Sequence, residues 1–180
     1  MLPIRFLLRC DRLAGAEPRC GGPPFEILGI QGAADRLAVS VLAERCRADD
    51  PAIAGRFAAT GLQAELTNRV GRTVHAWLAW RRRGPDAAAE DCPLGMLSLV
   101  ETGRGGRTRS SIAWLLVHPA ARRQGVATAL VRRAMAHVRA NGGSEVWAET
   151  LSTWPAAAAF WRNCAEETIS ATSDAGYTHA

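Results

Sequence analysis

Lysine is absent from this sequence of 180 residues, so all 22 basic residues are arginine. Against 17 acidic residues they leave a net charge of +5, which suits a phosphate-bearing partner. No apolar run approaches the roughly 20 residues of a membrane-spanning helix, and the longest clear run is 112–117. The first residues also lack the apolar length of a secretory signal, because Pro3 and Arg5 interrupt them. We therefore expect a cytoplasmic protein with no membrane partner.

Cysteine is too scattered for a disulfide framework or a zinc site. The five cysteines are odd in number, form no C-x-x-C pair and have no histidine at ligand spacing. They are Cys10, Cys20, Cys46, Cys92 and Cys164. We expect reduced, mostly buried thiols, and the sequence predicts no metal site.

The composition is that of one globular domain. Hydrophobic residues make up 48% of the chain and charged residues 22%, and the length is sufficient for one hydrophobic core. Glycine and proline occur too often in residues 1–24 for a regular element. We therefore expect an N-terminal extension over 1–24 and the folded domain over 25–180.

Hydrophobic periodicity from residue 25 onward predicts a mixed α+β fold. Strands are expected at 25–30, 73–80, 94–102, 110–117 and 145–151, and helices at 34–48, 49–66, 124–140 and 155–163. The three strands between 73 and 117 form an antiparallel meander, which 145–151 continues. In the helix at 34–48, Leu37, Val41 and Leu42 are expected to share the buried face. The stretch after Cys164 is weakly patterned, with Ile169 and Tyr177 as its main apolar anchors.

The most informative stretch is 117–130, in which a buried-looking strand runs through a proline-containing turn into a helix. The first turn of a helix has backbone amides without intrahelical partners and a partial positive charge, so it can hold a phosphate without special side chains. Gly125 would let a ligand approach the backbone, while Arg122 and Arg123 add charge at the rim. The alternative is that the arginines are a solvated helix start and that Gly125 is a packing choice.

Residues 122–127, with the sequence Arg-Arg-Gln-Gly-Val-Ala, resemble the Q/R-x-x-G-x-G/A signature of the GNAT superfamily, the acyl-CoA-dependent N-acyltransferases. The order of elements over 25–164 is similar to that of the family, and 157–164 resembles its second motif. The resemblance implies a GNAT-like fold, with a central, twisted, mostly antiparallel sheet flanked by helices in a single domain. It also implies acetyl-CoA or another acyl-CoA as cosubstrate, without a metal.

In this family, acyl-CoA enters a gap between the strand before the signature and the next strand. The resemblance implies that pantetheine pairs with the end of the first strand and that the pyrophosphate lies on the amides of the signature turn. Trp161 of the second motif would pack on the pantetheine or belong to the core. The implied cofactor-binding residues are Leu115, Leu116, Val117, Arg122, Arg123, Gln124, Gly125, Val126, Ala127, Thr128 and Trp161.

Two residues of the second motif depart from the family pattern. Trp161 takes the place of a tyrosine that usually acts as general acid toward the CoA sulfur, and an indole N–H cannot deliver a proton near neutral pH. Trp154 takes the place of an asparagine that often begins the motif. Protonation of the leaving group then falls to water or is unnecessary, because a thiolate is a fairly good leaving group.

Glu149 is the candidate catalytic residue. It lies near the end of the strand at 145–151, where the gap should open, so it could relay the proton of the amine through water. A solvent-facing glutamate is the equal alternative. His118 is interpreted as a turn residue rather than a base. Asp49 and Asp50 could attract a cationic amine, but capping of a helix start already explains them.

The sequence therefore predicts an acyl-CoA N-acyltransferase that moves an acetyl or short acyl group to a primary amine by direct attack. A catalytically impaired CoA-binding module is the alternative, suggested by Trp154, Trp161 and the short stretch after Cys164. Nucleic-acid binding is a remote third hypothesis. The net charge and the arginine clusters at 81–83, 104–109 and 122–133 suggest it, but these clusters have no interleaved aromatic platform. A homodimer stays open, and the acceptor cannot be read from the sequence.

Overall fold

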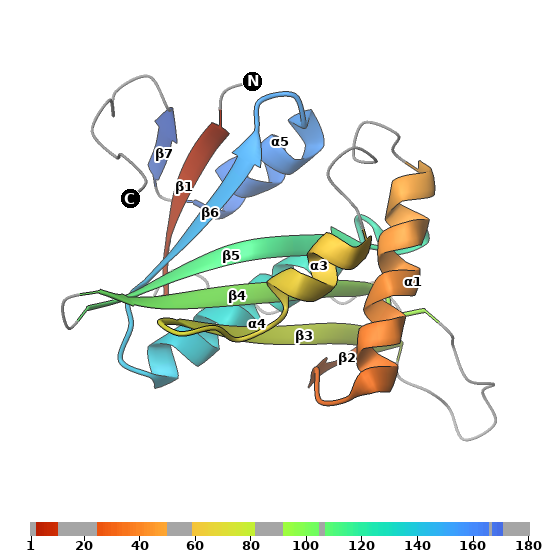
Figure 1. Ribbon diagram of the computed structural model, residues 1–180. Coiled ribbons are helices and arrows are strands. Elements are labelled where there is room, and N and C mark those ends of the chain that lie inside the picture. The colour runs from red at the N-terminus through yellow and green to blue at the C-terminus, as the bar shows by residue number, and fades with distance from the viewer. Residues whose placement is uncertain are drawn as a thin grey trace.

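The computed structural model describes residues 3–10, 25–49, 59–81, 92–104, 107–165 and 167–170. These residues build one seven-stranded sheet in the order β2-β3-β4-β5-β6-β1-β7 (Figure 1). The strands are β1 (Pro3–Arg9), β2 (Phe25–Gly29), β3 (Arg72–Arg81), β4 (Gly95–Arg104), β5 (Arg107–Val117), β6 (Glu145–Leu151) and β7 (Glu167–Ser170). The helices are α1 (Ala33–Asp49), α3 (Ala59–Glu65), the 3-10 helix η2 (Pro119–Ala121), α4 (Val126–Ala140) and α5 (Pro155–Cys164). No helix among these residues is long and apolar enough to span a membrane.

The expected α+β class and the mostly antiparallel sheet are confirmed, since every neighbouring pair of strands except β5 and β6 is antiparallel. The strands predicted after residue 24 are present within a few residues of their expected bounds, and so are the helices predicted at 34–48, 124–140 and 155–163. Of the helix predicted at 49–66, the described residues after 58 form α3, whereas Asp49, interpreted as the cap of its start, is instead the last residue of α1. Tyr177 lies outside the described residues.

β1 corrects the expectation that residues 1–24 contain no regular element. It pairs antiparallel with β6 along its whole length, and its other edge pairs with β7, which the weakly patterned tail forms. Phe6 and Leu8 of β1 are fully buried. The apolar pattern of β1 is short and interrupted by Arg5, so its non-local partners specify the strand more than any local signal does. The remainder of the predicted extension, 11–24, lies outside the described residues.

β6 is a second correction, because it extends the sheet without continuing the meander. Within the described ranges it lies parallel to β5 and pairs with it only at Ser111↔Trp147 and Ile112↔Ala148. α4 supplies the crossover connection that a parallel pair requires. Beyond the two pairs the strands diverge, and the free end of β6 leads to α5 (Figure 1).

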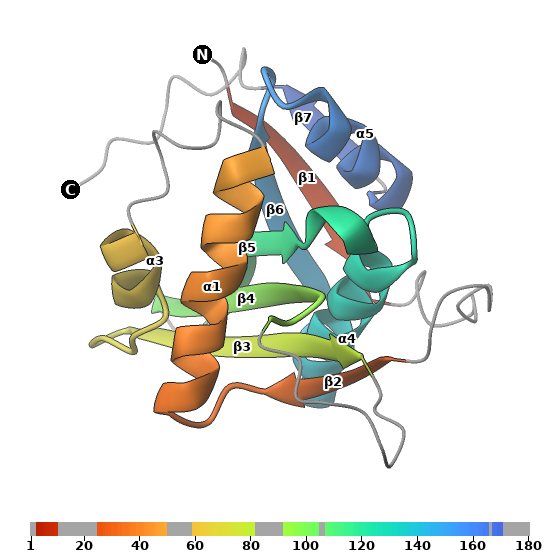
Figure 2. The ribbon, with the colours of Figure 1, turned by 90° about the vertical axis from the view of Figure 1, so that its right-hand side faces the viewer.

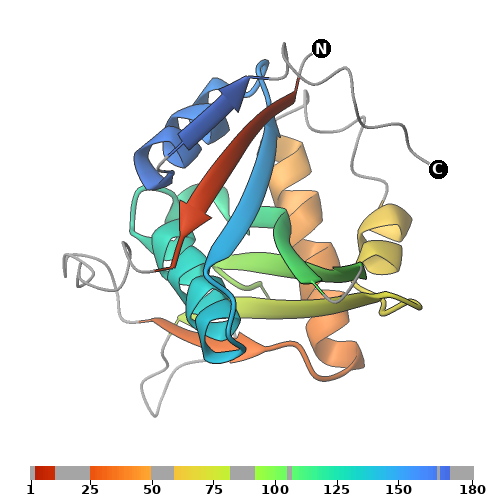
Figure 3. The ribbon, with the colours of Figure 1, turned by 90° about the vertical axis from the view of Figure 1, so that its left-hand side faces the viewer.

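Helices cover both faces of the sheet (Figures 2 and 3). α1 and α3 pack on one face, where Met96 is fully buried. α4 and α5 pack on the other face, over a core that includes Leu97 and Leu130. On α1, Leu42 is fully buried as predicted, but Leu37 is 68% exposed, so its predicted place on the buried face is wrong. The buried residues of α1 instead include two small ones, Ala38 and Ala43.

A β-bulge in β5 determines which of its side chains face each layer. The register with β4 shifts between Ser98 and Leu99, which leaves Ala113 without a partner on β4. Ile112 before the bulge and Leu115 after it both pack toward the α4 layer, although strict alternation would place them on opposite faces. The bulge thus lies where β5 and β6 begin to separate.

The last turn of α4 packs against β3 through aromatic rings. The His137 ring centroid lies 4.1 Å from that of His75 and 5.5 Å from that of Trp77. Burial lowers the pKa of His137, and the neighbouring His75 lowers it further, so this imidazole is neutral at neutral pH. The ring contacts hold the C-terminal end of α4 on the sheet.

Gly95, the first residue of β4, allows α4 to pack tightly on the sheet. A Cβ at this position would lie 2.8 Å from the carbonyl oxygen of Leu116 and 2.9 Å from Val126 Cγ1. Gly95→Ala is therefore expected to lower the free energy of unfolding by roughly 1–3 kcal/mol, the usual cost of overpacking. Urea unfolding followed by circular dichroism measures this loss. The control is Gly103→Ala in the same strand, where a Cβ meets nothing within 4 Å; equal losses in the two variants would contradict the explanation.

Candidate functional site

A cavity of about 1140 Å³ lies where β5 and β6 diverge. Its walls come from these two strands, the turn before α4 and the start of α5, with contributions from β1 and α1. All of the predicted cofactor-binding residues except Gln124 line it, and so does Glu149. The fold therefore brings together residues that the sequence analysis had selected from two separate motifs. The volume is sufficient for an extended ligand larger than a typical small metabolite.

One wall of the cavity is the edge of β5 after the bulge. Among the described residues, positions 113–117 have β4 on one side and no strand on the other, because β6 has turned away. Such an edge can pair with an extended ligand in the manner of an added strand. The carbonyl oxygen of Val117 already accepts a hydrogen bond from Cys46 Sγ at 3.5 Å. Within the described residues, the edge of β5 at 113–117 therefore faces no second strand, and its last carbonyl oxygen, that of Val117, is hydrogen-bonded to α1.

The turn before α4 forms another wall. Gly125 has a φ of 82° and Arg123 a φ of 63°, both in the left-handed region. The N-cap residue of α4 is Gly125, which has no side chain to cap the helix, and the Ala129 N–H donates to the Gly125 carbonyl oxygen at 3.0 Å. The amides of Ala127 and Thr128 precede that bond along the helix, and both residues line the cavity. The turn therefore presents N–H groups and the positive end of the helix dipole to the cavity, an arrangement that binds anions.

Contacts in this turn separate the two interpretations left open by the sequence. A Cβ on Gly125 would meet nothing within 4 Å, so the glycine is required by its φ and not by packing. Arg122 is not simply solvated, because its Nη1 lies 2.5 Å from Asp49 Oδ2 and ties the turn to the end of α1. Gln124 Nε2 donates to the carbonyl oxygen of Ala120 at 2.8 Å. Gln124 thus has a structural contact and does not line the cavity.

The tryptophans of the second motif both line the cavity. Trp161 is only 5% exposed and belongs to the core on the α4 side, so it is at once a core residue and a cavity wall. Trp154 precedes α5 as its N-cap residue. Trp114 and Trp147 add two further indoles to the lining. No tyrosine lines the described part of the cavity.

Glu149 lies on the face of β6 that points away from α4. Its Oε2 accepts a hydrogen bond from Arg5 Nε at 3.1 Å, and the two side chains are 54% and 42% exposed. On the same part of the wall, the Arg109 guanidinium carbon lies 5.0 Å from the ring centroid of Trp147. Sequence reasoning missed Arg5 and Arg109, because only strand pairing brings Arg5 of β1 opposite Glu149 and Arg109 of β5 over the ring of Trp147.

Two other polar groups near the cavity are unsuited to be a base or a nucleophile. His118 Nδ1 accepts from the Ala120 N–H at 3.2 Å and caps η2, which confirms its interpretation as a turn residue. It lines a smaller cavity of about 250 Å³ and not the large one. Cys46 lines the large cavity, but burial raises the pKa of its thiol to about 11. The thiol is therefore protonated at neutral pH and is a poor nucleophile.

The model of the acetyltransferase (GNAT) family matches residues 59–165. That range contains the bulged strand, the turn before α4 and all of α5. No curated protein sequence matches the chain.

Solved structures with the same fold share little sequence with this chain. A transcriptional regulator from Bacillus halodurans has a TM-score of 0.61 at 18% identity, covering 87% of this chain and 100% of its own. A protein from Desulfovibrio desulfuricans classed as a GNAT acetyltransferase has a TM-score of 0.57 at 19% identity, covering 78% and 83%. An aminoglycoside acetyltransferase from an uncultured soil metagenomic sample, solved with trehalose, has a TM-score of 0.57 at 18% identity, covering 87% and 97%. At these identities the likeness shows the fold alone.

Proposed function

The chain belongs to the acetyltransferase (GNAT) family, and we propose that it transfers an acetyl or other short acyl group from acyl-CoA to a primary amine by direct attack. The observation that carries this proposal is the cavity between the diverging strands β5 and β6, which meets the uncapped N-terminus of α4. A long ligand with a polar, extended arm and an anionic pyrophosphate suits these two walls.

The proposed cosubstrate contacts follow from the lining. Backbone groups of Leu115 to Val117 would pair with the amide groups of pantetheine, as an added strand does. The amides of Ala127 and Thr128 would receive the pyrophosphate, with Arg123 at the rim of the same cavity. Arg122 contributes less charge than expected, because it is already paired with Asp49.

The proposed chemistry is attack of a neutral amine nitrogen on the thioester carbonyl. The C–N bond forms as the C–S bond breaks, the thiolate departs, and the amine loses one proton. Glu149 would take that proton through a water molecule, while water protonates the thiolate where needed. Direct attack is favoured over an acyl-enzyme, because the thiol of Cys46 is protonated at neutral pH.

The charge of the cavity wall around Glu149 bears on the acceptor. Among the described residues that line the cavity, four are arginines, Arg5, Arg109, Arg122 and Arg123, and Glu149 is the one with a carboxylate. We propose an acceptor amine that also carries an acidic group, for example a carboxylate, rather than a polycation. Amines with a carboxylate are therefore expected to show at least about a tenfold higher kcat/KM than matched polyamines, the effect of one favourable charge contact. A preference for polyamines would contradict this assignment.

Turnover is the experiment that tests the proposed function. Acetyl-CoA is incubated with a panel of acidic, neutral and cationic amines, and acetylated products are detected by mass spectrometry. The second candidate function is a CoA-binding module without transferase activity, favoured by Trp161 in place of a tyrosine. Saturable CoA binding by calorimetry with no product from any amine would support that candidate, whereas absence of CoA binding would remove both.

A further inference from the structure

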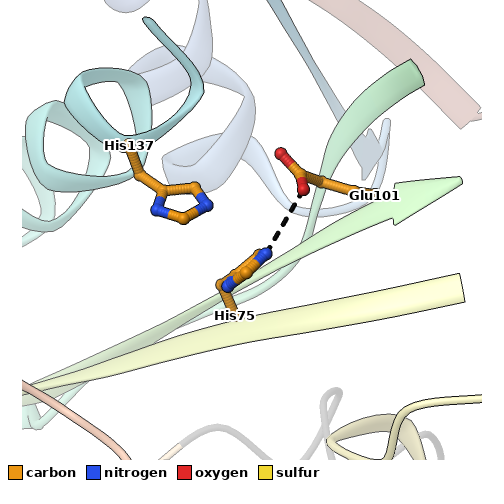
Figure 4. Close-up of side chains that lie close together, drawn as sticks. All are labelled: His75, Glu101 and His137. Carbon is orange, nitrogen blue, oxygen red and sulfur yellow. Dashed lines mark hydrogen bonds and ion pairs between the residues drawn. The ribbon is translucent and has the colours of Figure 1, made fainter. Parts of the chain in front are cut away.

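Three side chains gather at the C-terminal end of α4, outside the lining of the large cavity. His75 comes from β3, Glu101 from β4 and His137 from the last turn of α4 (Figure 4). One ligand atom of each, a ring nitrogen or a carboxylate oxygen, lies within 4.8 Å of the others. None of the three lines the large cavity or takes part in the proposed function. The cluster is partly buried, with side chains of His75 and Glu101 30% and 18% exposed.

The donor set is one that binds zinc. Two imidazole nitrogens and one carboxylate oxygen, with water in the fourth position, form a common tetrahedral zinc site. His75 Nε2 lies 3.2 Å from Glu101 Oε2, a separation that two ligands of one tetrahedral zinc ion can have. The other ligand atoms lie within 4.8 Å, so side-chain rotations that also separate the two imidazole rings would be needed to bring every pair to about 3.4 Å, the spacing that zinc bonds of roughly 2.0–2.1 Å imply. The partial exposure of the cluster leaves room for both the rotations and the water.

An outer contact orients one of the three groups. Ser110 Oγ donates to Glu101 Oε1 at 3.4 Å, which leaves Oε2 toward His75. Hydrogen bonds of this kind fix the direction of ligating side chains in metal sites. The alternative is a metal-free cluster in which His75 simply donates to Glu101.

We propose that His75, Glu101 and His137 bind a divalent transition metal ion, with zinc as the best fit, and that this ion fastens α4 to β3 and β4. His137 is twelve residues from Gly125 along the chain, or about 18 Å along a helix axis. The ion would therefore act on the stability of the fold and not on the acyl transfer. The proposal is independent of the proposed function.

The test uses the whole chain without a histidine tag, freed of metal by a chelator and titrated with zinc chloride alone. Calorimetry is expected to show one zinc ion bound per chain, and the melting temperature is expected to rise with zinc. Cobalt chloride in place of zinc is expected to give the visible absorption bands of a tetrahedral site, a signal that a hydrogen-bonded cluster cannot produce.

Glu101→Gln is the sharpest variant, because its amide oxygen can still accept the hydrogen bond of His75 while the ligating charge is lost. It is expected to weaken zinc binding at least about tenfold, the lower range for altered metal-site residues. His137→Asn is expected to abolish binding, and His118→Asn, which removes a histidine outside the cluster, is expected to leave it unchanged. Circular dichroism checks that each variant is folded. Absence of stoichiometric zinc binding by the wild type, or equal affinity in wild type and folded Glu101→Gln, would overturn the proposal.

Discussion

Gly125→Val is expected to weaken CoA binding by roughly 100-fold, equivalent to about 2.8 kcal/mol. At the φ of 82° a β-branched residue is strained, so the turn would relax toward another conformation and the amides after it would lose their direction. Gly125 lines the cavity together with Ala127 and Thr128, so the added side chain would also occupy the wall on which we propose that the pyrophosphate lies. Calorimetry with CoA measures the affinity of each variant.

Gly142→Val is the matched control for this variant. Gly142 follows the other end of α4, has a φ of 81°, and a Cβ there also meets nothing within 4 Å. The two variants should therefore lose similar stability, while Gly142→Val should bind CoA as the wild type does. Loss of CoA affinity in both variants to the same extent would mean that general destabilisation explains the effect, and retention in both would contradict the assignment of the turn.

Glu149→Gln is expected to lower kcat by about 100-fold or more with little change in the KM for acetyl-CoA, because only the path of the amine proton is lost. The hydrogen bond from Arg5 can still be made to the amide oxygen, so the wall should keep its shape. The pH profile of kcat separates a base from a shape effect: the variant should recover activity at higher pH, where hydroxide can accept the proton that the attacking amine loses, whereas a shape effect would lower kcat at every pH.

Glu145→Gln provides the control for this second variant. Glu145 lies on the same strand and the same face as Glu149 but does not line the cavity. Its kcat should match that of the wild type. If Glu149→Gln also kept its full kcat at neutral pH, the carboxylate would be a solvent-facing residue, and the amine would lose its proton directly to water.

The sequence was most informative where structure is local. The helix after residue 125, its turn and the strand before it follow from hydrophobic periodicity and from a glycine at a helix start, and these elements carry most of the cavity wall. The structure then showed why residue 125 is a glycine: its φ of 82° lies in the left-handed region, so the residue is not a packing choice.

What the sequence could not predict depends on pairing between distant segments. β1 has a short, interrupted pattern and becomes a strand through hydrogen bonds with β6 and β7. The ion pair of Arg5 with Glu149 follows from that register, since the two residues are opposite each other. His75, Glu101 and His137 have no ligand spacing along the chain, and only the packing of α4 on β3 and β4 brings them together. Non-local contacts of this kind leave no periodic signal.

A crystal structure of the protein soaked with CoA tests the central claim most directly, namely that acyl-CoA binds between β5 and β6 with its pyrophosphate on the turn before α4. We predict phosphate oxygens within hydrogen-bond distance of the amides of Ala127 and Thr128, and pantetheine beside the backbone of Leu115 to Val117. CoA bound at another surface, or a cavity without CoA at a concentration that saturates binding in solution, would contradict the claim.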